Sequence, residues 1–558
     1  MIQKIRNNEN LWSILCNIAL PLAILGVGVG TLLYYIIGPS AGYMTSDCTD
    51  SLRWSMATFE SGKLISDEFT YAAILPFGGN LIFLPFVAIF GYSMEAQIWG
   101  LSVFALLFAA ALCYMATGLG LDRIRASALV SIVILIMSSS PKLREIMWEH
   151  IFYYNLGILF FCLGFGLACR ILRDGGISFD PRAGRPMDWV RLGIILVFSV
   201  IAATDGLQAL ICFTLPLFCG IFAERFFDGS EKLLTKRNLL TAAFIGAVLL
   251  ASGIGYISID KVSGGVTAAY ADAYSTWSGS GSWVNNFLGF FPNWFTLLGV
   301  SVVQGDPLAS MDSLPDMLGI LGGIVLLVAP IVLLCFYKKI ESAAIRAVLI
   351  GHFAVSAFIL FAVTFGKLGG ANWRLTPMMG TACIVTVVAA FEFIRQKGLI
   401  ARFGTLLLAL LLVMAFVPAS EISEMPADYG RDNSWHTAAR VLEERGLKYG
   451  YANFWWAEIV TMISGGEVEV ANTYPDLKGN KPVRYDYQLP HGSFEDKDTD
   501  RYFLMLTELE NRNMSSYIST YRLMGKIVEE FTIESEPYDL RGYTGTRLYV
   551  YVFSENIF

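Results

Sequence analysis

The chain has 558 residues, of which 55% are hydrophobic and 16% charged, and its mean hydropathy is +0.55. These values exclude a water-soluble globular protein over most of the length. The net charge of −7 comes from one end, because residues 420–558 carry 14 Lys and Arg against 23 Asp and Glu, a balance that argues against nucleic-acid binding. All nine cysteines precede residue 384, so no disulfide framework is expected in the polar end.

Apolar segments recur from residue 11 to residue 418. The first, 11–37, follows Lys4 and Arg6 and is too long for the core of a signal peptide, which predicts an uncleaved span with a cytosolic N-terminus. Eleven further segments are long or apolar enough to enter a bilayer. They lie near residues 71–91, 97–119, 127–140, 151–171, 189–204, 207–223, 238–258, 315–337, 344–365, 376–394 and 400–418.

The distribution of Lys and Arg predicts the sidedness of the connections. Four connections are rich in these residues and are expected in the cytosol: 170–191, 224–238, 337–346 and 395–402. The more neutral connections would then lie outside, together with the polar end: 138–150, 204–206, 259–314, 366–375 and 420–558. A bacterial inner or plasma membrane is the expected location.

One stretch leaves the number of crossings open. The assignments require an odd number of crossings between residues 70 and 122, where two apolar segments are visible. One of them could be re-entrant, "DRIR" at 122–125 could lie outside, or the segment 127–140 could fail to span.

The polar end has the pattern of a small α/β domain. An apolar-periodic helix is expected at 437–446, where Gly446 ends it, and strands are expected at "YGYANFW" (449–455), "EVEVANT" (467–473) and "TRLYVYVFS" (546–554). The expected fold is therefore a polytopic α-helical membrane protein with about 11–13 transmembrane helices and a C-terminal extracytoplasmic α/β domain. Residues 1–419 would form the transmembrane domain and residues 420–558 the soluble domain.

An acidic cluster follows the first apolar segment directly. The stretch "YMTSDCTDSLRW" (43–54) contains Asp47 and Asp50, then Arg53. Residues 50–61 place their apolar side chains on one helical face, which predicts a short helix lying flat on the membrane with Asp50 in its first turn. Further acids follow in the same loop, namely Asp67 and Glu68.

Two later connections gather polar and aromatic residues at the same expected face. The segment "SSSPKLREIMWEH" (138–150) ends in Trp148, Glu149 and His150, and the segment "GKLGGANWRLTP" (366–377) contains Lys367, Trp373 and Arg374. Lipid head groups alone would also attract such residues. Asp205, in "AATDGLQ", is an acidic residue at a hairpin end, where a capping role is the commoner one.

Together these residue types suggest group transfer from a phosphate-activated lipid donor. The guanidinium of Arg374, with Lys367, is suited to hold a phosphate. A carboxylate of Asp47 or Asp50 could take a proton from an acceptor hydroxyl, while the cation stabilises charge on the leaving phosphate. The indoles of Trp54, Trp148 and Trp373 offer faces on which a sugar ring could stack. No nucleotide-binding motif with strand–helix context is present.

The long connection 259–314 is rich in Gly, Ser and aromatic residues. We predict a mobile lid or acceptor platform there, bearing Tyr274, Trp277, Trp283 and Trp294. The alternative is an interfacial loop anchored by its aromatic side chains.

Three motifs carry a resemblance to the GT-C fold glycosyltransferases. They are the acidic first loop, the segment "LPFGG…FLPFVAIFG" (75–91) and the late "WRLTP" (373–377) that leads into an apolar span. The chain resembles the bacterial dolichyl-phosphate-mannose:protein-mannosyltransferase-like enzymes and the aminoarabinose transferases acting on lipid A. The stretch "LKYGYANFWWAEIVTMISGG" (447–466) also resembles outer-domain segments of that family.

The resemblance implies roles for particular residues. A first-loop aspartate would be the catalytic base, which matches Asp50 best, with Asp47 as the alternative, and Arg374 would bind donor phosphate. The family has an adjacent Asp–Glu pair where this chain has Asp-Cys-Thr-Asp, and a "DE" pair occurs only later, so the base stays open among three positions. The acids could also hold a divalent cation, although no metal site or other cofactor is assigned.

The resemblance also implies the partners and the reaction. These are a polyprenyl-phosphate sugar donor, an acceptor that is a glycan, lipid or protein, and membrane lipids, with inversion at the anomeric carbon. The further residues expected to contact substrate are Arg53, Asp67, Glu68, Trp148, Glu149, His150, Lys367, Trp373 and Tyr274. Alternative functions are an envelope polysaccharide polymerase or ligase, and a transporter or flippase of lipid-linked sugars. A transporter should show internal repeats, and none is convincing here.

Overall fold

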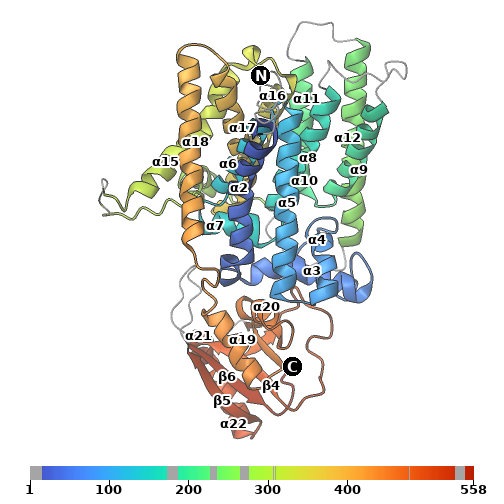
Figure 1. Ribbon diagram of the computed structural model, residues 1–558. Coiled ribbons are helices and arrows are strands. Elements are labelled where there is room, and N and C mark those ends of the chain that lie inside the picture. The colour runs from blue at the N-terminus through green and yellow to red at the C-terminus, as the bar shows by residue number, and fades with distance from the viewer. Residues whose placement is uncertain are drawn as a thin grey trace, which may run out of the picture.

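The computed structural model describes residues 15–172, 186–226, 235–263, 276–305, 307, 310–367, 369–476, 478–534 and 547–558 (Figure 1). A bundle of long helices occupies one end of the molecule and a sheet domain the other. Within the described residues, nine helices are long and apolar enough to cross a membrane, or up to ten if one bent pair is a single span. The chain is therefore a multi-pass membrane protein, as the sequence predicts.

The bundle is built around two helices that are buried along most of their length. In α17 (Thr376–Ile394) and α8 (Tyr153–Leu172), 94% and 83% of the apolar window is buried, so these helices form the centre of the bundle. The other long helices surround them and expose apolar side chains. They are α2 (Leu20–Ile37), α5 (Met94–Gly118), α11 (Leu215–Phe226, part of the longer span Leu207–Arg225), α12 (Lys236–Ser263), α15 (Leu314–Cys335), α16 (Ala343–Phe365) and α18 (Leu399–Glu424).

The structure resolves the odd crossing between residues 70 and 122. The helix α4 (Gly79–Phe90) has 12 residues with Pro85 inside it, which is too short to span a bilayer, so α5 is the long apolar helix of that stretch. The next helix, α6 (Arg123–Ile136), is bent by 115° against α7 (Pro141–Arg144) and the π-helical turn η4 (Glu145–Glu149). The predicted segment 189–204 also forms a short apolar helix, within α9 (Pro186–Ala203).

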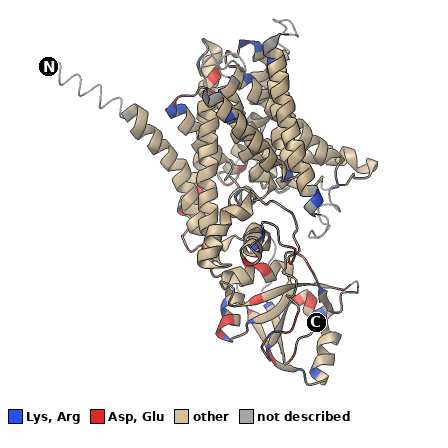
Figure 2. Ribbon diagram, turned by 90° about the vertical axis from the view of Figure 1, so that its right-hand side faces the viewer, with Lys and Arg blue, Asp and Glu red and all other residues tan. Residues whose placement is uncertain are grey.

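The two ends of the bundle differ in charge. Figure 2 shows Lys and Arg at the end of the bundle away from the sheet domain, where the described connections 337–346 and 395–402 lie. At the opposite end lie the acidic first loop, with α3 (Asp50–Ser61), and the sheet domain. The helix predicted at 50–61 is therefore present with the same bounds. It is buried on most sides, because the sheet domain covers it.

The sheet domain contains six strands in the order β3-β2-β1-β4-β6-β5. The central strands β2, β1 and β4 are parallel, and β3, β6 and β5 are antiparallel to their neighbours. The strands are β1 (Tyr449–Asn453), β2 (Glu469–Pro475), β3 (Pro482–Arg484), β4 (Tyr502–Thr507), β5 (Ile527–Glu534) and β6 (Arg547–Phe553). The helices are α19 (Ser434–Glu444), α20 (Phe454–Ile463), α21 (Glu508–Asn513) and α22 (Ser515–Leu523). The helix and three strands predicted from sequence are thus present.

The two faces of the sheet pack differently, because successive strand residues point to opposite sides. Phe503 and Met505 of β4 belong to the same continuous hydrophobic core as the membrane helices and α20. Their neighbours Tyr502 and Leu504 belong to a smaller separate core that α22 covers. The sheet domain is therefore packed against the bundle through one face.

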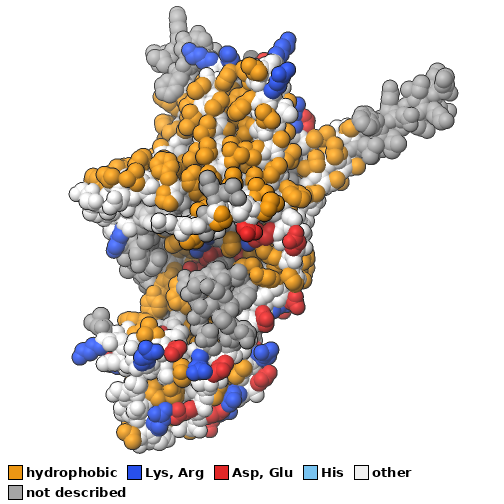
Figure 3. Space-filling model, turned by 90° about the vertical axis from the view of Figure 1, so that its left-hand side faces the viewer, with side chains coloured by type: hydrophobic (Ala, Val, Ile, Leu, Met, Phe, Trp, Pro, Cys, Tyr) orange, Lys and Arg blue, Asp and Glu red, His pale blue; other side chains and the backbone are white. Residues whose placement is uncertain are grey.

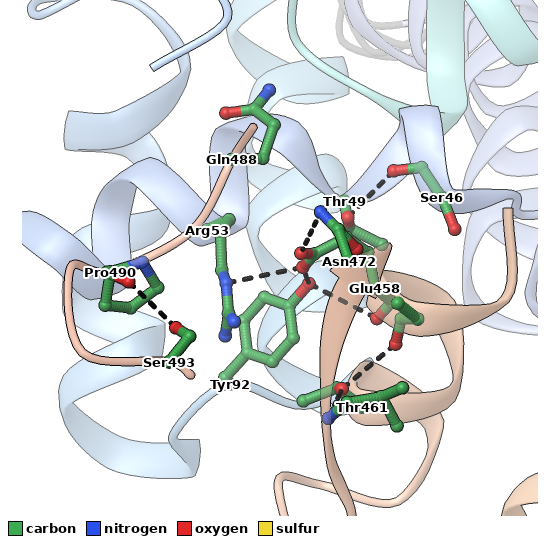
Figure 4. A network of polar contacts seen from close by, with 12 residues as sticks. Ser46, Thr49, Arg53, Tyr92, Glu458, Thr461, Asn472, Gln488, Pro490 and Ser493 are labelled. Carbon is green, nitrogen blue, oxygen red and sulfur yellow. Dashed lines mark hydrogen bonds and ion pairs between the residues drawn. The ribbon is translucent and has the colours of Figure 1, made fainter. Parts of the chain in front are cut away.

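Polar contacts also join the two parts. A bridge pairs Phe69 of the first loop with Pro490 of the sheet domain, and the Thr70 N–H donates to the Leu489 carbonyl at 3.0 Å. Arg53 of α3 forms a buried ion pair with Glu458 of α20 at 3.3 Å (Figure 4). The first loop is thus held between the membrane helices and the sheet domain.

Candidate active site

A cavity of 2160 Å³ lies between the bundle and the sheet domain. Figure 3 shows the apolar belt of the bundle, the charged surface of the sheet domain and a recess between them. The cavity wall has three parts: a polar centre, an apolar arm between α11, α12 and α16, and a rim from the sheet domain. The rim consists of Asn453, Phe454, Trp455, Thr473, Tyr474, Pro475, Tyr485, Tyr487 and Glu510.

The first-loop carboxylates Asp47 and Asp50 both line the polar centre. Asp47 lies in the 3-10 turn η3 (Ser46–Thr49), which a capping box between Thr45 and Cys48 begins, and Asp50 is the first residue of α3. Asp50 is 7% exposed, and its Oδ1 has no hydrogen-bond partner within the described residues. The turn therefore directs two acids at one wall of the cavity.

Buried groups behind the turn hold it in place. The Gln97 amide donates to the backbone carbonyls of Cys48 and Glu149, at 2.8 Å each. The Glu149 carboxylate accepts from the Tyr35 hydroxyl at 2.5 Å and from the Cys48 thiol at 3.7 Å. Because Gln97 and Glu149 are fully buried, this cross-link fixes the backbone that carries the two aspartates.

The surroundings of Asp50 suit a proton acceptor. Burial raises the pKa of its carboxyl well above the usual range, and the charges of Asp47 and Glu458 raise it further. The amide of Gln488 from the sheet domain lowers it. A carboxyl tuned in this way exchanges a proton closer to neutral pH than an exposed aspartate does.

Arg374 lines the same cavity as the two aspartates. It lies in the 3-10 turn η9 (Asn372–Leu375) before α17, and its Nε is buried with no hydrogen-bond partner within the described chain. Tyr154 forms side-chain hydrogen bonds with Arg374 and Trp373, and it also lies within electrostatic reach of Asp47. The cavity therefore joins Arg374 to both first-loop aspartates.

A second cation stands beside Arg374. Lys142 lines the cavity, and its ammonium lies 4.7 Å from the centre of the Trp373 ring and 2.9 Å from Glu145 Oε2. His150 also lines the cavity, stacked against Phe152 at a ring distance of 5.8 Å. Lys142 and Arg374 are the Lys and Arg residues of the lining within the described residues.

Five residues expected to contact substrate have other surroundings. Trp148, Glu149 and Arg53 are buried in packing and polar contacts and do not line the cavity, so the Trp148 indole, which donates to Ser138 Oγ, has no face free for a sugar. Asp67 pairs with Lys63 at 2.6 Å on the surface, and the Glu68 carbonyl accepts from the His491 N–H. Neither of these acids lines the cavity.

The structure gives the surroundings of two further predicted residues, and a third lies outside the part of the chain that it describes. Lys367 is exposed and lies outside the cavity lining, and its N–H donates to the Thr276 carbonyl. Trp54 is buried, with its ring against Tyr71 and Phe152. Tyr274 lies outside the described residues.

The connection expected to be a lid is partly helical. It contains α14 (Trp283–Leu297), in which Trp294 is fully buried and donates to the Gly323 carbonyl at 3.0 Å. Trp294 is therefore packed in the core instead of presenting a platform. Trp277 does line the cavity and is paired with Gly366 in an isolated bridge.

Sequence reasoning missed the contribution of the sheet domain. Gln488 is 1% exposed and is the one non-glycine residue with a positive φ, +59°, in the described backbone. Its Oε1 accepts from the Trp54 indole at 2.6 Å and from the Ala72 N–H at 3.3 Å, so its NH₂ group points away from these two donors. The strained backbone was not readable from sequence, because it follows from the pairing of residues 488–491 with 68–70.

A metal site is not evident. The described residues contain no group of three or more His, Cys, Asp or Glu side chains placed to hold a metal ion. The divalent cation that the sequence left open stays a prediction, and the proposed reaction does not depend on one.

The fold and cavity define a multi-pass helical membrane protein with a site at the junction of its bundle and its sheet domain. Neither a protein-family model nor a curated protein matches the sequence. Solved structures with a similar layout include the oligosaccharyltransferase of Archaeoglobus fulgidus with Zn and sulfate, at a TM-score of 0.48 and 11% identity, covering 89% of this chain and 69% of that one.

Two further similar structures contain lipid phosphates. The Archaeoglobus fulgidus enzyme AglB with an inhibitory peptide and a dolichol-phosphate has a TM-score of 0.46 and 11% identity, covering 95% of this chain and 74% of that one. ArnT from Cupriavidus metallidurans bound to undecaprenyl phosphate has a TM-score of 0.43 and 11% identity, covering 97% of both chains. Both are GT-C fold glycosyltransferases, the class that the sequence motifs resemble. At these scores the likeness is one of layout, and what those proteins bind remains a property of those proteins.

Proposed function

We propose that this protein transfers a sugar from a polyprenyl-phosphate-linked donor to an acceptor hydroxyl, at the outer face of a bacterial inner membrane. The observation that carries the proposal is the single cavity lined by Asp47, Asp50 and Arg374. A carboxyl and a guanidinium that line one space are the two groups that such a transfer needs.

The apolar arm of the cavity suits the lipid. Ile211, Leu215, Ile259 and Phe358 line it between the helices, so an isoprenoid chain could lie there with its phosphate at the polar centre. Arg374 and Lys142 are the cations available to that phosphate, and a guanidinium can hold two of its oxygens at once. Lys367, which the sequence paired with Arg374, lies outside the lining.

The reaction balances with one proton transfer. The acceptor hydroxyl attacks the anomeric carbon as the Asp50 carboxylate takes its proton, with Asp47 as the alternative base. The bond between the anomeric carbon and the phosphate oxygen breaks, and the electron pair leaves with the polyprenyl phosphate. Arg374 stabilises the charge that develops on this phosphate. Attack from the side opposite the phosphate inverts the anomeric carbon.

The acceptor would enter from the sheet domain. The rim carries the aromatic rings of Phe454, Tyr474, Tyr485 and Tyr487, and the last two stack with their centres 5.1 Å apart. These rings face the same cavity as the acids. A glycan, a glycolipid or a protein side chain could use them.

The test separates the base from the phosphate site. Asp50→Asn should abolish release of polyprenyl phosphate from labelled polyprenyl-phosphate sugars while leaving lipid binding intact, with Asp47→Asn as the matched variant. Arg374→Glu should weaken binding of polyprenyl phosphate itself, and Lys367→Glu, on the same connection but outside the cavity, should not. Near-wild-type turnover of both aspartate variants would contradict the assigned base, and equal effects of the two charge reversals would contradict the phosphate site.

A further inference from the structure

Asp205 is a buried carboxyl group in the cavity wall that the proposed reaction does not use. It lies in the turn between α9 and α10 (Leu207–Ala209), is 5% exposed and lines the cavity together with Thr204 and Gln208. Both of its carboxyl oxygens are buried and have no hydrogen-bond partner within the described residues. A native structure rarely leaves such a group without a partner, because the lost hydration is uncompensated.

The capping role expected for Asp205 does not apply. The residue at the N-cap of α10 is Gly206, with a φ of +76°, and no side chain caps that helix. Burial raises the pKa of the Asp205 carboxyl well above its usual value. The raised pKa favours the protonated form of Asp205, which offers one O–H donor and one carbonyl acceptor.

The position of Asp205 relates it to the candidate base. Tyr153, the first residue of α8, lies within electrostatic reach of both Asp205 and Asp50. The adjacent Tyr154 lies within electrostatic reach of Arg374 and Asp47. The first turn of α8 therefore lies near the base, Arg374 and Asp205, and all of them line the cavity in which the sugar of a bound donor would lie.

We propose that Asp205 binds hydroxyl groups of the donor sugar and so selects the sugar-bearing lipid over the bare lipid phosphate. A neutral carboxyl that both donates and accepts matches a sugar hydroxyl, and filling its two vacant hydrogen-bond positions removes the penalty of its burial. Placed in the wall of the cavity, it contacts the sugar and neither the isoprenoid nor the phosphate. The proposal rests on the proposed function, because it assumes a lipid-linked sugar in this cavity.

The test measures binding of two probes to purified full-length protein. The first is bare polyprenyl phosphate, and the second is the best-bound member of a panel of polyprenyl-phosphate hexoses and pentoses. Asp205→Asn, which keeps a donor and an acceptor, should bind the sugar-bearing lipid within a few-fold of wild type. Asp205→Leu should bind it about tenfold more weakly, as expected for the loss of hydrogen bonds to a neutral group, while its affinity for bare polyprenyl phosphate is unchanged.

Each other outcome overturns the proposal. If Asp205→Asn loses as much affinity as Asp205→Leu, the group acts as a charge, for example toward an amino sugar. If Asp205→Leu keeps full affinity for the sugar-bearing lipid, or weakens both probes equally, the residue does not contact the sugar. Unaltered binding of bare polyprenyl phosphate also shows that Asp205→Leu is folded. Failure of the proposed function would differ, because wild-type protein would then bind neither probe or would bind both without transfer.

Discussion

The ion pair between Arg53 and Glu458 gives a quantitative test of how the sheet domain is held on the bundle. The two groups are 3.3 Å apart, and Glu458 is 1% exposed. The Glu458 carboxylate also accepts from the Tyr92 hydroxyl and from the Asn472 amide, at 3.2 Å each (Figure 4). Glu458→Ala removes all three contacts and leaves the guanidinium of Arg53 buried and unpaired.

The expected loss follows from this geometry. Breaking a buried ion pair by removing one partner costs about 3–5 kcal/mol. That energy corresponds to a change of roughly two to three and a half powers of ten in the equilibrium between docked and undocked sheet domain. The double variant Arg53→Met with Glu458→Leu should recover most of the loss, because neither charge then remains to be desolvated.

A native thiol reports the undocked state. Cys48 is fully buried in η3, which packs against α20, and its thiol contacts Glu149 behind the turn, so undocking would free η3 to open and expose Cys48 to a water-soluble maleimide. The rate of Cys48 labelling, measured by peptide mass spectrometry, should rise in Glu458→Ala in proportion to the undocked population.

A surface ion pair provides the matched control. Glu529 pairs with Arg445 and Arg501 at partly exposed positions, where such a pair contributes about 0–1 kcal/mol. Glu529→Ala should therefore change Cys48 labelling by less than tenfold. An unchanged rate of Cys48 labelling in Glu458→Ala, or an equal rise of this rate in both variants, would refute the inference that the buried ion pair holds the sheet domain on the bundle.

Three further predictions concern the site and the sidedness. The rate of transfer should rise as the pH increases through the pKa of Asp50, because the base must be ionised. Since this pKa is raised, the acid limb of the pH–rate profile should lie at higher pH than it would for an exposed aspartate, and a limb near pH 4 would contradict this. Gln488→Ala should move that limb to still higher pH without changing the KM for the donor, since its amide lowers the pKa of Asp50; an unmoved limb would mean that Gln488 only packs. In intact cells an impermeant maleimide should label Ser516→Cys of the sheet domain and leave Lys339→Cys, at the other end of the bundle, unlabelled until the membrane is permeabilised; the reverse pattern would invert the topology.

Local patterns were sufficient for many elements of the fold, although the strands β3, β4 and β5 were not predicted. Long apolar runs predicted the membrane helices, and the helix at 50–61 and the strands at 449–453 and 547–553 follow from periodicity within a few residues. The span count was less accurate, because hydropathy alone does not show that Pro85 and a length of 12 residues make α4 too short to cross. The face occupied by α3 was also not predictable, since it depends on a sheet domain that begins hundreds of residues later.

The residues of the candidate site also differ in whether the sequence alone could predict their roles. Asp50 and Arg374 were recognisable as polar residues beside membrane spans, and their chemistry could be stated from residue type alone. Gln488 and Asp205 were not recognisable in these roles, because one is an ordinary loop residue and the other resembles a helix cap in sequence.

The sequence by itself determined that this protein is a polytopic membrane protein with a polar C-terminal domain, because hydropathy and periodicity act over a few neighbouring residues. Only the tertiary structure decided which acids face Arg374 across one cavity and which, like Glu149 and Asp67, are occupied elsewhere. Burial and hydrogen-bond pairing depend on segments far apart in the chain. The role of an acidic residue, as a base, as part of a buried polar contact or as a surface charge, is therefore set by the residues that surround it in the folded chain.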